Sequence, residues 1–203
     1  MERTISWFGL AAGITTLVLV AVSVFVPWWQ LTVGDDFASV YASPIVTNFG
    51  FYGAQFTLPL LWAWNLSNIL LFTAGGVIML VYSVFPTKSY SKDLLCFSYK
   101  KPLYGFLSFV VGLAVIVLSA GFFDLGIPLV GTANVNLSFP SFIPLSASIS
   151  SSVTAMFLFP FYLAIAAVVL CVAARFYHVR LIKASDAVQS TEIAISPANP
   201  VTQ

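Results

Sequence analysis

Charged residues are scarce in this chain. Only 7% of its 203 residues are Asp, Glu, Lys or Arg, whereas about 25% of a typical soluble domain is charged. So few charges cannot cover the surface of a water-soluble domain, which argues against that class. Eight basic and seven acidic residues give a formal net charge of +1. The chain therefore has no general electrostatic basis for binding nucleic acid.

Histidine and cysteine are equally scarce, with His178, Cys96 and Cys171 as their only representatives. One histidine excludes haem ligation by two histidines of this chain, and it argues against a three-ligand zinc site. Two cysteines far apart in sequence do not form a disulfide framework. Nucleophile elbows, zinc-protease motifs, phosphate loops and dinucleotide fingerprints are absent from the sequence. We therefore expect no cofactor and no catalytic or metal site, and predict that the chain is not an enzyme.

Long apolar runs, by contrast, are abundant, and 60% of the residues are hydrophobic. A membrane-spanning helix needs about 20 mostly apolar residues, and four stretches reach this length. The sequence predicts an all-α integral membrane protein, a four-transmembrane-helix bundle within residues 1–183. A flexible cytoplasmic tail is predicted for residues 184–203. The predicted helices cover residues 5–26, 60–85, 103–123 and 153–177.

The positions of the basic residues predict an orientation. None falls in the 27–59 or 124–152 connection. Basic residues favour the cytoplasmic side of a membrane, so both termini and the middle loop are predicted to be cytoplasmic. Two outer loops of about 25–30 residues then face outside a cell membrane that the chain crosses several times. The basic residues are Arg3, Lys88, Lys92, Lys100, Lys101, Arg175, Arg180 and Lys183.

The two outer loops have an unusual composition. They contain no Lys, Arg or His, and their only acids are Asp35, Asp36 and Asp124. Either these loops pack on each other or on a partner, or the exterior is acidic enough to protonate carboxylates. The first loop is rich in β-branched and aromatic residues around a Gly-Asp-Asp turn, which predicts a short hairpin. The outer loops are therefore expected to form a small β cap.

Tryptophans cluster near the ends of the predicted helices. An indole ring is apolar, but its N–H needs a polar partner, so Trp favours the membrane–water interface. Pro27 helps to end the first helix at this depth. An aromatic ligand site is the alternative. The predicted interface anchors are Trp7, Trp28, Trp29, Trp62 and Trp64.

Small residues recur every three or four positions in three of the predicted helices. Such stripes lie along one helix face and let helices approach closely in lipid. They predict helix-packing seams, and whether one seam faces another subunit stays open. The seam residues are Gly9, Gly13 and Thr16 in the first helix, Gly105, Ser108 and Gly112 in the third, and Ala164, Ala167 and Cys171 in the fourth.

Few polar side chains fall within the predicted spans. Asn65 and Asn68 either bond across helices or lie at headgroup level, and Asp124 is either a solvated helix end or an ion site. These three residues are the candidates for a polar pathway. Asn136 lies mid-loop in an N-x-S sequon and is the candidate for N-glycosylation.

The predicted cytoplasmic loop over residues 86–102 has four lysines with interspersed tyrosines. Lys and Tyr at a cytoplasmic surface can bind anionic lipid headgroups. The alternative is that these lysines only orient the chain in the membrane.

The predicted topology resembles that of claudin-like tetraspan proteins, with four spans, both ends inside and two outer loops. Trp28 and Trp29 are similar to the tryptophan that opens the first outer loop of that family. The family's Gly-Leu-Trp followed by two cysteines is absent here. The nearest stretch, Phe51-Tyr52-Gly53, has no cysteine after it.

We predict a non-catalytic accessory or scaffold subunit of a larger membrane assembly. Its expected partners are membrane lipids and other integral membrane proteins or copies of itself, and not nucleic acid. One alternative is an oligomeric channel or carrier with a pathway lined by Ser, Thr and Asn. Another is a cofactor-free subunit of a membrane enzyme complex.

Overall fold

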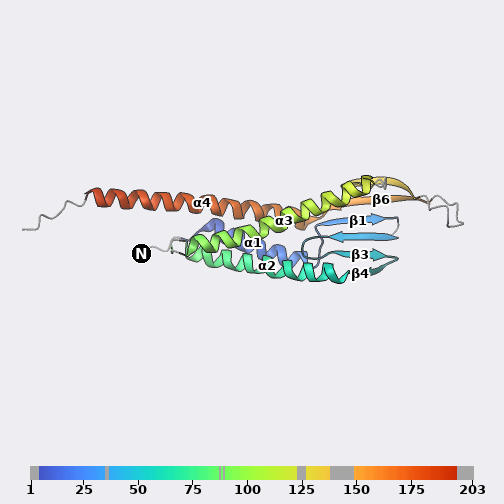
Figure 1. Cartoon of the computed structure of the whole chain (residues 1–203), viewed down its shortest axis with the longest axis horizontal. Coiled ribbons are helices and arrows are strands. Elements are labelled where there is room, and N and C mark those ends of the chain that lie inside the picture. The colour runs from blue at the N-terminus through green and yellow to red at the C-terminus, as the bar shows by residue number, and fades with distance from the viewer. Residues whose placement is uncertain are drawn as a thin grey trace, which may run out of the picture.

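The computed structural model describes residues 5–34, 37–86, 88, 90–122, 127–137 and 149–195. The strands gather at one end of this part of the chain, and the helices extend from beside them toward the other end (Figure 1). The helices are α1 (Trp7–Ser23), α2 (Pro59–Val84), α3 (Ser91–Phe122) and α4 (Phe159–Ile195). The strands are β1 (Trp29–Val33), β2 (Ala38–Ala42), β3 (Asn48–Phe51), β4 (Ala54–Phe56), β5 (Gly131–Leu137) and β6 (Ile149–Phe157).

The strands form one six-stranded antiparallel sheet, so the all-α prediction was wrong. Its order is β4-β3-β2-β1-β6-β5. β1 and β6 pair across the sheet centre with Leu31 opposite Ala155, which joins both predicted outer loops into one structure. The expected hairpin is only a part of this sheet. The β-branched and aromatic residues of the hairpin suit a pleated, half-buried surface. No short stretch of the sequence indicates that the two outer loops pair with each other.

Among the described residues, three helices, not four, are long and apolar enough to cross a membrane: α2, α3 and residues Phe159–Arg180 of α4. The prediction of four membrane-spanning helices was therefore also wrong. α1 is apolar but has only 17 residues, about 26 Å of helix. The Ser6 side chain caps its start by accepting a hydrogen bond from the Gly9 N–H at 3.3 Å. Pro27, which has no N–H, follows shortly after its end.

The predicted fourth helix began too early, because residues 153–157 belong to β6. Val153 and Ala155 are buried while Met156 is exposed, which is the alternation of a strand. Pro160 then lies in the first turn of α4, where its missing N–H costs little. At the other end α4 continues to Ile195, through most of the segment predicted as a flexible tail. Residues 196–203 lie outside the described chain.

α3 begins at Ser91, well before the predicted start at residue 103. The first three turns of α3 carry charged residues, so a search for long apolar runs did not include these turns in the predicted helix. Ser91, Leu95, Ser98 and Pro102 are buried at helical spacing along one face. Gly75 of α2 approaches this face, since a Cβ built on it would lie 3.4 Å from the Ser98 carbonyl oxygen. The cationic segment is therefore part of the packed bundle.

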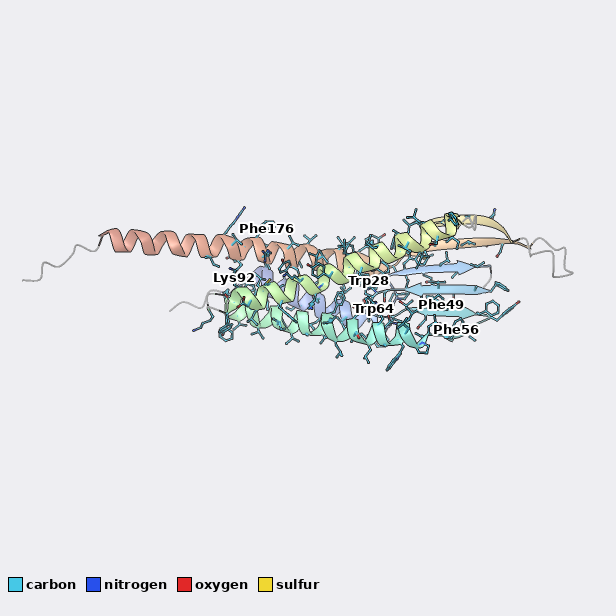
Figure 2. The ribbon with its side chains drawn as sticks, in the orientation of Figure 1. Trp28, Phe49, Phe56, Trp64, Lys92 and Phe176 are labelled. Atoms are coloured by element: carbon cyan, nitrogen blue, oxygen red, sulfur yellow. The ribbon has the colours of Figure 1, made fainter. Side chains whose placement is uncertain are left out.

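Basic residues occupy the end of the bundle away from the sheet. Lys92, at the start of α3, lies at this end (Figure 2). Arg175 and Arg180 lie well along α4, whose first residues follow directly from β6. α1 starts at the same end, because the Ser6 N–H donates to the carbonyl oxygen of Ser83, near the end of α2, at 3.0 Å.

Candidate functional site: the sheet and its junction with the helices

Trp28 and Trp29 join the sheet to the helices, and Figure 2 shows Trp28 at this junction. Both have 0% exposure, so their rings lie inside the protein and not on its surface. The Trp28 Nε1–H donates to Ser23 Oγ at 2.8 Å, and the Trp29 Nε1–H donates to the Leu129 carbonyl oxygen at 2.9 Å. Their polar atoms are thus satisfied inside the protein, which removes the need for an interfacial position.

The Trp28 ring contacts aromatic side chains of two helices. Its centroid lies 6.5 Å from that of Phe72 in α2 and 5.2 Å from that of Phe109 in α3, both edge to face. The Trp28 backbone accepts a hydrogen bond from the Leu158 N–H and donates one to the Ala42 carbonyl oxygen. Trp28 therefore bonds to β2 on one side and to the residue that follows β6 on the other, and it packs on two helices, which fixes the sheet to the bundle.

The connection between β2 and β3 is also closely bonded. Ser43 Oγ accepts from the backbone N–H groups of Ile45 and Val46 at 3.2 and 2.8 Å. The Thr47 hydroxyl donates to the Ser43 carbonyl oxygen at 2.9 Å. Ile45 has 0% exposure. These bonds hold the second hairpin, β3 and β4, in line with the rest of the sheet.

Phe37, Phe51 and Tyr52 form an exposed cluster that we call the aromatic tip. Their ring centroids lie 4.9–5.2 Å apart in edge-to-face pairs. Phe37 is 38% exposed, Phe51 49% and Tyr52 73%. β1 starts at the junction and β2 returns to it, so the β1–β2 and β3–β4 turns that carry the tip lie at the far end of the sheet (Figure 1).

Tyr52 adopts a backbone conformation that is unfavourable for its side chain. Its φ is 50°, and the adjacent Gly53 has φ 78°. This left-handed region costs a residue with a Cβ about 1–2 kcal/mol. The Tyr52 N–H donates to the Phe37 carbonyl oxygen at 3.0 Å, which ties the two turns together. Backbone strain of this kind is found at functional sites more often than elsewhere.

The sheet carries no charged side chain in the described residues of 27–58, 127–137 and 149–158. All three residues of its edge strand β4 are exposed. Phe56 of this strand stacks on Phe49 of β3 with centroids 5.9 Å apart (Figure 2). An exposed edge strand that lacks charge is a site where another chain can pair or pack.

A cavity of about 430 Å³ lies between the end of α1 and the sheet. Its lining is uncharged and combines polar and apolar side chains. Asn48 Oδ1 in its wall accepts a hydrogen bond from the Thr57 hydroxyl. The lining residues are Ser23, Val24, Phe25, Pro27, Tyr41, Val46, Asn48 and Gln55.

The predicted seam residues of α1 and α4 lie at close helix contacts. A Cβ on Gly9 would lie 3.0 Å from the Tyr82 ring, and one on Gly13 would lie 2.7 Å from Leu80. Thr16 is buried, and its hydroxyl donates to the Ala12 carbonyl oxygen at 2.8 Å. In α4 the corresponding residues are at most 1% exposed: Ala164, Ala167 and Cys171.

The predicted seam of α3 is arranged differently. A Cβ on Gly105 would lie 2.3 Å from the Phe72 ring, so this glycine admits a close aromatic contact. Ser108 and Gly112 are exposed, and a Cβ on Gly112 would meet nothing within 4 Å. Within this chain the buried stripe of α3 runs instead through Pro102, Phe109, Leu113 and Ala120. The role of Ser108 and Gly112 as a helix-packing seam stays a prediction, and whether they face another subunit stays open.

The other predicted sites are dispersed. Trp7, Trp62 and Trp64 are 71%, 61% and 56% exposed, so they are available to lipid. Asn65 is buried, and its Oδ1 has no hydrogen-bond partner, whereas Asn68 is half-buried. Asp124 lies outside the described residues. Asn136 lies in β5, opposite Ser150 of β6, and its side chain is not described.

Sequence reasoning missed two features. The aromatic tip was signalled only by Phe51-Tyr52-Gly53, which resembles a turn. His178 is 3% exposed, its ring lies edge-on to Tyr82 at 5.4 Å, and neither ring nitrogen has a hydrogen-bond partner. Among the described residues, no group of three or more His, Cys, Asp or Glu could hold a metal ion.

No family model matches the sequence, and no curated protein matches it either.

Proposed function

We propose that this chain is an integral membrane protein with α2, α3 and α4 crossing the bilayer of the cell membrane. The sheet then faces outside, and the basic end of the bundle faces the cytoplasm. The shorter helix α1 starts at the basic end and leads to β1, so the chain also passes through the bundle along α1, which leaves both termini on the cytoplasmic side. The distribution of Lys and Arg supports this orientation. The exposed side chains of α2 support lipid contact, since Leu60, Trp62 and Leu70 are each more than 60% exposed.

Within this placement, the chain acts as a non-catalytic accessory or scaffold subunit that binds a partner protein through its sheet. The aromatic tip is the observation that carries this proposal. Exposed aromatic clusters are typical of binding hot spots, since they bury a large area and lose little side-chain entropy. The tip lies at the end of the sheet away from the basic end of the bundle, on the side that the proposed placement puts outside the membrane (Figure 1).

The chemistry of the sheet defines the kind of partner. Its described residues are uncharged, so they offer a partner no salt bridge. The tip and the exposed β4 edge instead fit a partner that offers an apolar pocket beside a strand or loop with free backbone groups. Such a partner is another membrane protein with an outer domain, or a second copy of this chain.

The two alternatives predict different complexes. A channel or carrier requires several copies around a polar axis, and Asn65, buried with an unpartnered Oδ1, is the polar group that favours it. A subunit of a membrane enzyme complex requires co-purification with a cofactor-bearing protein. The mass and composition of the native complex in mild detergent distinguish both from a scaffold.

Removing the aromatic tip is expected to release the partner. The double variant Phe51→Thr/Tyr52→Asn keeps strand propensity at residue 51 and a side chain that tolerates positive φ at residue 52. Loss of aromatic hot-spot residues typically costs at least about 2 kcal/mol, so affinity should fall more than tenfold. The measurement is native mass spectrometry of the complex purified from the native membrane.

Phe176→Ala is the matched control, because Phe176 is 67% exposed but lies on the outer surface of α4 (Figure 2). This variant should keep the partner. If the unmodified chain purifies as a lone monomer, or if the tip variant keeps its partner as well as the control does, the proposed function is wrong.

A further inference from the structure

A groove on α3, near the basic end of the bundle, has chemistry that the partner-binding role does not use. It has a volume of about 320 Å³ and is lined by Asp93, Cys96, Phe97, Lys100, Lys101 and Tyr104. These residues recur at helical spacing on the face opposite the buried stripe of α3. We propose that this groove binds the negatively charged headgroup of a membrane phospholipid.

The length of α3 places the groove at headgroup depth. The helix has 32 residues, about 48 Å, whereas the hydrocarbon core is about 30 Å thick. Its last 20 residues, from Leu103, contain no charge and match that thickness. Lys100 and Lys101 then lie at the boundary of the hydrocarbon, where phosphate groups are found. This step uses the proposed membrane placement and not the proposed partner.

The charges and rings of the groove suit a phosphate. Lys100 and Lys101 are half-buried, and Asp93 is the only acid in the lining. Lys101 Nζ lies 4.9 Å from the centroid of the Phe97 ring, a contact that orients the ammonium group along the groove. Two ammonium groups and the Tyr104 hydroxyl supply donors for phosphate oxygens. Basic grooves on the cytoplasmic side of transmembrane helices bind anionic headgroups for this reason.

An apolar track continues from the groove toward the sheet. Leu107, Val111, Val115 and Leu118 follow Tyr104 at the same helical spacing, and each is more than 50% exposed. α3 is also the least covered of the three spanning helices. A phospholipid with its headgroup in the groove can therefore lay an acyl chain along this track. That continuity favours a lipid over a soluble acidic peptide or a free phosphate ion.

The test measures lipid binding by the full chain in detergent. Native mass spectrometry follows titration with dioctanoyl phosphatidylserine, and with dioctanoyl phosphatidylcholine as the zwitterionic probe. We expect the anionic lipid to bind at least tenfold more tightly. In Lys100→Gln/Lys101→Gln this preference should fall at least fivefold, because both ammonium donors are lost. Inorganic phosphate at the same concentration should not displace the lipid, and displacement would assign the groove to free phosphate.

Lys88→Gln/Arg180→Gln is the matched control, since it removes the same charge at the same end of the bundle outside the groove. The control should keep the preference. An equal loss in both double variants would mean that diffuse charge attracts the lipid, and equal binding of the two lipids by the unmodified chain would also overturn the proposal. An unchanged melting temperature shows that each variant is folded. If the double variant melts early, Lys100→Gln alone provides the same comparison. Lipid binding is measured without a partner, so its failure leaves the role of the aromatic tip standing.

Discussion

Trp28→Ala is expected to destabilise the protein by about 3–5 kcal/mol, the largest loss we predict for a single substitution. The reason is the position of Trp28 between the sheet and two helices. Its ring is fully buried against Phe72 and Phe109, and its Nε1–H bonds to Ser23. Alanine would leave a large cavity and an unpaired Ser23 hydroxyl at the junction. Denaturant or thermal unfolding of the detergent-solubilised chain measures the loss.

Trp62→Ala is the control for this prediction, since it removes the same ring from an exposed site on α2. Its effect should stay within about 0.5 kcal/mol, as for most surface positions. Trp28→Phe separates the two contributions, because it keeps most of the ring packing and removes the hydrogen bond. Equal losses for the two alanine variants would show that Trp28 is not part of a packed junction.

Gly105→Ala is expected to cost about 1–3 kcal/mol through overpacking. The new Cβ would lie 2.3 Å from the Phe72 ring. Phe72 is 1% exposed and packs edge-on against Trp28, so its ring can move aside only by disturbing the junction. The same unfolding measurement applies, and Gly105→Ala combined with Phe72→Leu should be more stable than the sum of the single changes predicts.

Gly112→Ala is the matched change on the same helix. Its Cβ would meet nothing within 4 Å, so the variant should be unchanged or more stable by up to about 1 kcal/mol through better helix propensity. A loss at Gly112 as large as at Gly105 would mean that a neighbouring molecule covers the exposed face of α3.

Helix positions could be predicted from the sequence where a helix coincides with one long apolar run. α2 was expected over residues 60–85 and occupies Pro59–Val84, because Pro59 starts a long uninterrupted run. The same criterion failed for residues 153–157, where a strand is followed after one residue by the apolar helix that starts at Phe159. Strand and helix are both apolar there, and only the alternating burial of Val153 and Ala155 separates them.

The site could not be predicted because its contacts are distant in sequence. An indole that ends an apolar run suits a lipid interface and a buried junction equally well. Which of the two positions the indole takes depends on where the hydrogen-bond acceptor of its N–H lies. For Trp29 the acceptor is the carbonyl oxygen of Leu129, 100 residues away. The aromatic tip likewise joins Phe37 to Phe51 and Tyr52 through the pairing of β2 and β3.

The central claim is that the sheet and the lysines lie on opposite sides of a membrane. Cysteine labelling in sealed cells with a membrane-impermeant maleimide tests it most directly. In a Cys96→Ser/Cys171→Ala background, one variant carries Ala54→Cys on the exposed strand β4 and the other carries Lys88→Cys. The account predicts labelling of residue 54 in intact cells and of residue 88 only after permeabilisation. Labelling of residue 88 in intact cells, at the rate seen for residue 54, would contradict it.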